Sequence, residues 1–199
     1  MRTEKFRSDS YLGLVEGNLS PALLASGAVP LAHYRVEGHP DRLILLRGFA
    51  SMAARRKALT AFHAGRDWAE RRAEATGLTR DLRVSLTRAI RPEEGLRVIR
   101  GGGRLAVLAS ELRFSEQIGN YHLWLRLLLR KAGLDPVAAF ATLESVNDVP
   151  AVPVVRNRSQ HFALMPAGGR LPDLPAELRA MLRYPPEVLM LEPASALVW

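Results

Sequence analysis

A short pattern that occurs twice in the chain constrains the fold more than any other feature. Gly27-Ala28-Val29-Pro30 and Gly133-Leu134-Asp135-Pro136 are each followed by an aliphatic residue, an alanine, one further residue and an aromatic ring. A glycine in the left-handed conformation ends a helix, and a proline can open a strand where no N–H donor is needed. The offset of 133 − 27 = 106 residues also superimposes helix leucines, Leu19 and Leu23 on Leu125 and Leu129. We interpret the pattern as an internal duplication.

Hydrophobic periodicity predicts a similar order of helices and strands in both halves. In the first half it predicts a helix over 9–27 with a break at Pro21, strands over 30–36 and 42–49, helices over 52–64 and 67–75, and a strand over 82–90. Ser51 is the expected N-cap of the helix over 52–64. In the second half it predicts strands over 104–114, 136–143, 160–166 and 187–191 and helices over 115–131 and 175–182.

These elements predict an α+β protein made of two tandem ferredoxin-like (split βαβ) repeats. The first repeat covers residues 1–92 and the second covers 104–199, with a linker at 93–103 that contains three consecutive glycines. The opening strand of the first repeat is short or missing, because residues 2–6 are few and mostly charged. A single repeat leaves one face of its antiparallel sheet bare, so we expect both sheets to bury these faces in a dimeric-α/β-barrel-like body.

Composition excludes several classes of function. The chain has no cysteine, which rules out disulfides, thiol catalysis and cysteine-bound zinc. The net charge is +8, but the basic residues are spread along the chain between acids with no long run of like charge, so we expect no nucleic-acid partner. No apolar run is long enough to span a membrane, and the N-terminus lacks the apolar core of a signal peptide. These features are typical of a cytoplasmic protein.

A segment of the first half resembles the NIPSNAP family. It runs from Leu46-Arg47-Gly48-Phe49 through Met52, Arg55, Ala58-Leu59 and Phe62 to Gly65 and Trp68. Weaker similarity to bacterial tandem members of the family extends over 144–156 and 186–193. The chain departs from the family at His63, where tyrosine is common, and at Arg66, where proline is common. The resemblance implies the dimeric α+β barrel fold and no particular reaction, since one fold serves many functions.

Three residues are candidates for lining a ligand cavity in the first repeat: His33, Tyr34 and Arg47. His33 and Tyr34 lie in the middle of a predicted strand, and Arg47 interrupts an apolar one. Arg47 either binds an anion or packs its stem in the core with its charge on a carboxylate or a helix C-terminus. Fold analogy alone suggests His33 as a haem ligand. No histidine has a metal-ligand spacing and no nucleophile motif occurs, so we assign no metal, no cofactor and no catalytic residue.

Two functions of different classes fit these observations. The first is a NIPSNAP-like protein of undefined biochemical activity that binds a small apolar molecule or a protein partner, with homo-oligomers possible. The alternative is a cofactor-free monooxygenase that works in the barrel cavity. Ala138, Ala139 and Ala141 leave room for such a cavity, but small residues equally allow a helix to pack closely.

Overall fold

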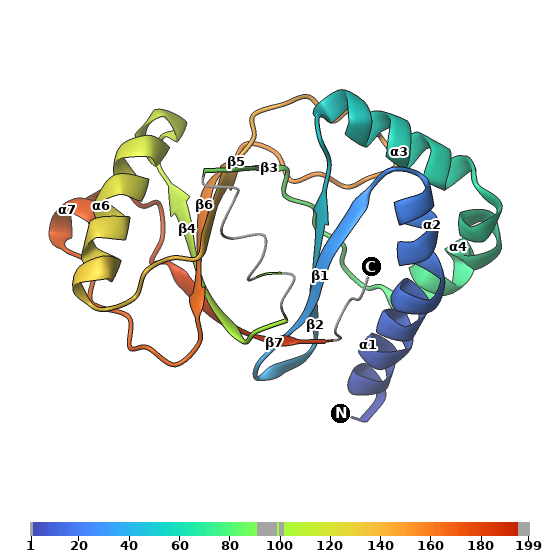
Figure 1. The fold of residues 1–199 in the computed structure, drawn as a ribbon, viewed down its shortest axis with the longest axis horizontal. Helices are drawn as coiled ribbons and strands as arrows, with labels where there is room; N and C mark the ends of the chain where they lie inside the picture. The colour runs from blue at the N-terminus through green and yellow to red at the C-terminus, as the bar shows by residue number, and fades with distance from the viewer. Residues whose placement is uncertain (1, 91–98, 100–101, 195–199) are drawn as a thin grey trace. The chain divides into compact units, whose positions relative to one another are not determined.

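The chain is an α+β protein that divides into two compact units (Figure 1). The computed structural model describes residues 2–90, 99 and 102–194. Within these residues, unit 1 comprises 2–84, 146–154 and 194, and unit 2 comprises 85–145 and 155–193. The predicted linker at 93–103 lies mostly outside the described residues, so the repeat limits 1–92 and 104–199 stay predictions.

Unit 1 combines a helical layer with a two-stranded antiparallel hairpin. Its elements follow the predicted order: α1 (Arg2–Leu14), η1 (Val15–Leu19), α2 (Ser20–Ala25), β1 (Val29–Val36), β2 (His39–Gly48), α3 (Met52–Ala64) and α4 (Arg66–Leu78). The hairpin register places Val29 opposite Gly48. Ser51 caps α3 as predicted, because its hydroxyl accepts the N–H of Ala54 at 3.1 Å.

The first helical segment is interrupted before Pro21, by one turn of π-helix. In this turn, η1, the N–H of Ser20 bonds to the carbonyl of Val15, five residues back. Proline has no N–H to donate within a helix, and its ring crowds the preceding turn. A wider turn is one of the few ways in which a helix absorbs such a defect. The break expected at Pro21 is therefore present, and its form is a π-turn followed by the short helix α2.

A buried ion pair fastens the segment 146–154 to α3 in unit 1. Arg55 is almost fully buried, and its Nη1 lies 2.5 Å from Oδ1 of Asp148. Asn147 supports the turn, since its side chain donates to the carbonyl of Val152 and accepts the N–H of Val149. Val149 is itself buried in the unit 1 core with residues of α2 and α3. The long loop of the second half thus completes the core of the first unit.

Unit 2 is built on an antiparallel sheet. Its elements are β3 (Thr87–Ala89), β4 (Leu105–Leu112), η2 (Ser115–Gln117), α6 (Ile118–Lys131), β5 (Ala138–Thr142), β6 (Ser159–Pro166), α7 (Ala176–Ala180) and β7 (Glu187–Pro193). The strand order is β7-β4-β6-β5-β3, and each neighbouring pair is antiparallel. β4 is hydrogen-bonded on both sides, to β6 along its full length and to β7 over five residue pairs.

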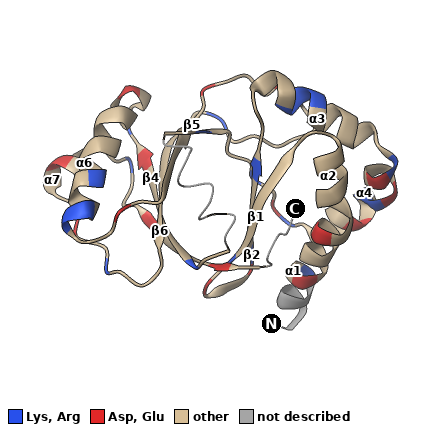
Figure 2. Ribbon diagram, viewed as in Figure 1, with Lys and Arg blue, Asp and Glu red and all other residues tan. Residues whose placement is uncertain are grey.

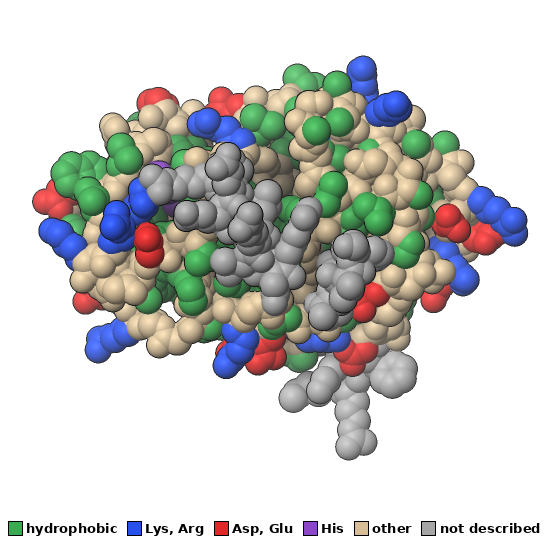
Figure 3. Space-filling model, viewed as in Figure 1, with side chains coloured by type: hydrophobic (Ala, Val, Ile, Leu, Met, Phe, Trp, Pro, Cys, Tyr) green, Lys and Arg blue, Asp and Glu red, His purple; other side chains and the backbone are tan. Residues whose placement is uncertain are grey.

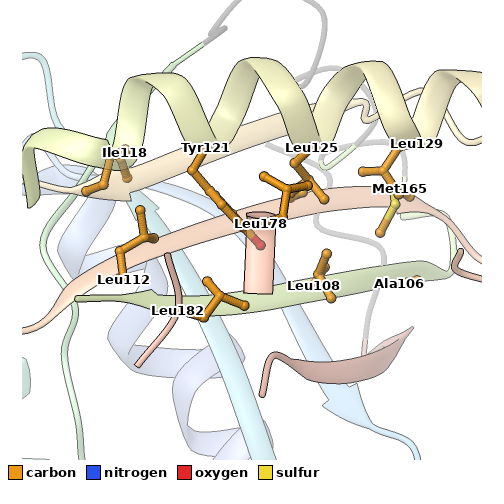
Figure 4. Close-up of a cluster of buried hydrophobic side chains, with 12 residues drawn as sticks. Ala106, Leu108, Leu112, Ile118, Tyr121, Leu125, Leu129, Met165, Leu178 and Leu182 are labelled. Atoms are coloured by element: carbon orange, nitrogen blue, oxygen red, sulfur yellow. The ribbon is translucent and has the colours of Figure 1, made fainter. Parts of the chain in front are cut away.

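The core of unit 2 lies between α6 and this sheet. Alternate residues of β4 face the helix, among them Ala106, Leu108 and Leu112. They meet four residues of α6 spaced by three or four positions, Ile118, Tyr121, Leu125 and Leu129, as Figure 4 shows. Ala141 of β5 belongs to the same packed cluster. The small residues of β5 could either leave room for a cavity or allow a helix to pack closely. At Ala141 the second interpretation holds, because this residue packs in the core with α6.

The junction that occurs twice in the sequence has the same geometry in both units. Gly27 and Gly133 have φ of 96° and 73°. The next residue bonds back to the leucine five positions earlier in each case: Ala28 N to Leu23 O at 3.0 Å, and Leu134 N to Leu129 O at 2.8 Å. This is the bond pattern of a Schellman helix end. The predicted helix stop at a left-handed glycine is confirmed at both positions.

The strand predicted over 82–90 is only partly correct. β3 covers Thr87–Ala89 alone, and Val84 makes one isolated parallel bridge to Val154. Leu82 is 49% exposed, so the apolar half of the alternating pattern is not buried along its whole length. Alternating apolar and polar residues form a strand only where the apolar side packs against other residues. The first residues of 82–90 lack such a packed side.

Alanine at the two junction glycines tests their conformational role. No heavy atom lies within 4 Å of a Cβ added at Gly27 or Gly133, so the cost of Gly27→Ala and Gly133→Ala comes from the left-handed backbone alone. We expect each to lower the free energy of unfolding by about 1 kcal/mol in chemical denaturation.

Gly77 provides the matched control, because it lies within α4 with an ordinary helical backbone and open space around it. Gly77→Ala should raise stability by about 0.5 kcal/mol. If all three variants changed the free energy of unfolding in the same direction, the left-handed role of Gly27 and Gly133 would be contradicted.

Candidate functional site

The side chain of His33 lies in a buried polar cluster between β1 and the helices of unit 1. Its Nδ1 is 3.3 Å from Oε1 of Glu16 on η1, and its Nε2 is 3.5 Å from Oγ of Ser20 on α2. Both helix residues reach the ring because positions four apart share one face of a helix. The arrangement fits a neutral ring in which Nδ1 donates to Glu16 and Nε2 accepts from Ser20.

The structure brings His33 and Arg47 to one face of the hairpin and turns Tyr34 to the other. His33 pairs with Leu45 across the hairpin, and Leu45 and Arg47 are two positions apart on β2. Side chains two apart on a strand point to the same side, whereas neighbours such as His33 and Tyr34 point to opposite sides. The three predicted site residues therefore do not form one cluster. Tyr34 is fully buried, and burial raises the pKa of its hydroxyl.

Arg47, on the same face of the hairpin as His33, has a guanidinium nitrogen with no partner in the described part of the chain. Its Nε is buried and has no hydrogen-bond partner among the described residues. Burial lowers the pKa of its guanidinium, and nearby Tyr11 opposes that shift. The charge of Arg47 in turn contributes to lowering the pKa of both His33 and His63. The packing interpretation of Arg47 placed its charge on a carboxylate or a helix C-terminus. Arg47 is buried as that interpretation expects, but within the described residues it forms no ion pair with a carboxylate.

The order Ser20–His33–Glu16 is that of a hydroxyl, a base and an acid that orients the base. Catalysis by such a set requires the hydroxyl to meet a substrate. Ser20 is 0% exposed and His33 is 1% exposed. Burial is the largest influence on His33 and lowers its pKa, although Glu16 pulls it upward. In this conformation the cluster holds a neutral imidazole in place between helix and strand.

His33 does not fit the role of a haem ligand. Both of its ring nitrogens face polar partners, so an axial bond from Nε2 would require Ser20 to move away. Over residues 2–90, 99 and 102–194, no group of three or more His, Asp or Glu side chains is placed to hold a metal ion.

The sequence interpretation found His33 but missed Glu16 and Ser20. A signal was present, since the two residues are four positions apart on a segment predicted to be helical. It could not be read as a site, because the strand that brings His33 to them is a separate element. The pairing is a property of tertiary packing.

Unit 2 contains a second buried polar cluster that the sequence did not indicate. The hydroxyls of Ser110 and Tyr121 lie 2.7 Å apart, and Nδ1 of His122 lies 3.0 Å from Nε2 of His161. The ring of Tyr121 also meets that of His161 edge to face. Nδ1 of His161 is buried without a partner among the described residues. Burial, helped by the charge of His122, lowers the pKa of His161 to about 3.

A shallow hollow of about 230 Å³ opens between α2 and α3 of unit 1. It is lined by Ala22, Ala25, Ser26, Ala61, Phe62, Gly65 and Asp67. The hydroxyl of Ser26 donates a hydrogen bond to the carbonyl of Ala22. Asp67, in the first turn of α4, is the only lining residue with a charge. The lining is otherwise mostly apolar, which is typical of ligand sites.

Charge is mixed on some helices and basic on others. Figure 2 shows Lys and Arg together with Asp and Glu on α4, where Arg66 pairs with Glu70, whereas α3 and α6 carry Lys and Arg alone. The basic residues of α3 do not all reach the surface, since Arg55 is buried against Asp148. Among the described helices, none is both long and apolar enough to cross a membrane.

Comparisons with protein-family models, with curated proteins and with solved structures gave no match to this chain. The resemblance to the NIPSNAP family therefore depends on the motif from Leu46 to Trp68 and on the weaker similarity over 144–156 and 186–193.

The Glu16 carboxylate should be measurable through its effect on His33. Glu16 raises the pKa of His33 by its hydrogen bond and its charge, so Glu16→Gln should lower that pKa further. An NMR titration of the His33 imidazole measures the change. Asp9→Asn is the control, because Asp9 pairs with Arg35 on the same strand and does not act on His33. An unchanged or higher pKa in Glu16→Gln would refute the contact.

The buried His161 should make the protein sensitive to acid. Its folded pKa of about 3 lies below the 6.5 of an ordinary histidine, so the unfolded chain takes up this proton first as the pH falls. Its contribution to stability is present above pH 6.5 and is lost progressively down to about 3, at roughly 1.4 kcal/mol per pH unit. Chemical denaturation at several pH values between 6.5 and 4 measures how the free energy of unfolding depends on pH. That dependence should be steeper in the native chain than in His161→Gln by this amount.

The exposed His39 supplies the matched control for a histidine-to-glutamine exchange, because its side chain lies outside the buried cluster of His161. If His161→Gln does not fold, NMR on the native chain still decides the matter. A His161 ring that titrates near pH 6 in the folded protein would overturn the prediction.

Proposed function

We propose that the chain is a NIPSNAP-like binding protein that holds a small apolar group in the hollow between α2 and α3. The observation that supports this most directly is the overlap of the hollow with the family-like motif. Phe62 and Gly65 belong to the motif and line the hollow. Phe62 also packs in the unit 1 core and Gly65 ends α3, so these motif residues shape both the core and one wall of the hollow.

The size of the hollow limits what it can hold. At about 230 Å³ it is smaller than the roughly 300–1,000 Å³ of sites for drug-sized ligands. It exceeds the roughly 150 Å³ apolar cavity that accommodates benzene. A single ring or a short branched chain fits these limits. The carboxylate of Asp67 at the rim favours an occupant with an amine or another donor at one end.

The fold that we propose for the chain is a pair of split βαβ repeats. In unit 2, the strand order β7-β4-β6-β5 with antiparallel neighbours supports this assignment. The Schellman bonds repeated 133 − 27 = 106 residues apart support the duplication. Under this assignment the two repeats differ at their start. Unit 1 begins with helix α1 (Arg2–Leu14), whereas the second repeat begins with strand β4 (Leu105–Leu112).

Binding in the hollow can be tested with indole and its amine derivative tryptamine. Saturable NMR shifts should appear at residues of α2 and α3, with dissociation constants in the millimolar range and tighter binding of tryptamine. Ala61→Leu fills the hollow and should raise the dissociation constants of both ligands at least about tenfold. Asp67→Asn should remove only the preference for the amine.

Ala53→Leu is the matched control, because Ala53 is exposed on α3 and does not line the hollow. Shifts that do not saturate, or that survive Ala61→Leu, would refute the site. The alternative, a cofactor-free monooxygenase, differs in one measurable respect: it would consume oxygen together with the bound compound.

A further inference from the structure

The outward side of α6 carries large apolar side chains that unit 2 does not cover. Leu123, Trp124 and Leu127 are 60%, 63% and 53% exposed. The opposite side of the same helix, with Leu125 and Leu129, points into the core, as Figure 4 shows. A surface helix normally turns polar residues to water, so three large apolar residues within one and a half turns require an explanation.

Charged residues at the two ends of α6 complete this surface, which we call the α6 stripe. Glu116 lies exposed just before the helix, and Arg130 and Lys131 lie exposed in its last turn. Positions 116, 123, 127 and 130 are separated by seven, four and three residues, which keeps them on one side of a helix. Within the described residues, none of the three charged side chains takes part in an ion pair. The stripe is thus acidic at one end, apolar in the middle and basic at the other.

A surface with this polarity is complementary to itself when reversed. If two such helices pack antiparallel about a point near Leu123 and Trp124, position 116 lies opposite positions 130 and 131, because 116 + 130 = 246 is twice 123. Each acidic end then meets a basic end, Leu123 and Trp124 of the two copies lie together at the axis, and Leu127 lies opposite Gly119, since 246 − 127 = 119. Antiparallel packing also opposes the two helix dipoles. A twofold axis produces both contacts at once from a single patch.

We propose that the α6 stripe is the interface of a homodimer in which α6 packs antiparallel against α6 of a second copy of this chain. In the space-filling view, hydrophobic side chains reach the surface at the end of unit 2 where α6 and α7 lie (Figure 3). A pair of single helices is at the small end of specific interfaces, so association is in the micromolar range.

Sedimentation velocity of the full chain, from about 1 to 200 µM, measures the dimer directly. The native chain should shift from monomer to dimer over this range. Leu127→Glu should raise the dissociation constant at least about tenfold, because it places a charge in the apolar centre. Leu82→Glu is the matched control, since Leu82 is equally exposed but lies in unit 1, and it should dimerise as the native chain does.

Charge reversal tests the antiparallel register itself. Glu116→Lys and Lys131→Glu should each weaken the dimer, and the double variant should return to within about threefold of the native dissociation constant. Circular dichroism should show native helix content in every variant, because the changes lie on the surface.

Three outcomes would overturn the proposal. The first is a native chain that stays monomeric throughout the range. The second is a dimer that Leu127→Glu leaves intact or that the double charge variant does not restore. The third is a chain that stays monomeric but binds phosphatidylglycerol vesicles, with Leu127→Glu abolishing that binding. This result would assign the α6 stripe to a membrane surface.

Discussion

The double-sided pairing of β4 is the constraint on which unit 2 depends. Hydrogen bonds to β6 and β7 satisfy the backbone of this strand on both edges, so its position in the sheet is fixed. Its alternate side chains then define the surface that α6 must cover. Ser110 stands among them where an apolar residue would be expected, and it is tolerated because the hydroxyl of Tyr121 meets it at 2.7 Å. The apolar side of α6 follows from this one strand, while its outer side is left to other contacts.

Burial controls the chemistry of the histidines in both units. His33 and His161 are held between a helix and a strand, where water is excluded and the charged imidazole is disfavoured. Each ring keeps its place through a neighbouring polar group, Glu16 in one case and His122 in the other. A Ser–His–Glu order that would suggest catalysis on an open surface acts here as a packing device, because its hydroxyl meets no solvent. The chemical identity of three residues does not define a site without access to it.

The elements that the sequence predicted well are those with a local cause. Gly27 and Gly133 end helices because only glycine takes the left-handed backbone at low cost, and Ser51 starts a helix because its hydroxyl caps it. Features that depend on distant partners could not be predicted. The strand at 82–90 is reduced to three residues because its apolar side is not fully buried, which alternation alone does not reveal. Likewise, Asp148 reaches Arg55 across a sequence distance of 93 residues.

The two copies of the junction lead to different surfaces, and the units also differ in the helix that follows the second strand after each junction. In unit 1, α3 has 13 residues and lies beside α2, so the pair forms a hollow at its margin. In unit 2, the corresponding place in the element order is taken by α7, which has five residues and contributes mainly Leu178 to the core. Leu123, Trp124 and Leu127 lie on the side of α6 that points away from the core, and they stay exposed. Under the proposed duplication, the two units therefore differ in the length of the second helix and in the surface they present: a hollow between α2 and α3 in one, and the apolar outer side of α6 in the other.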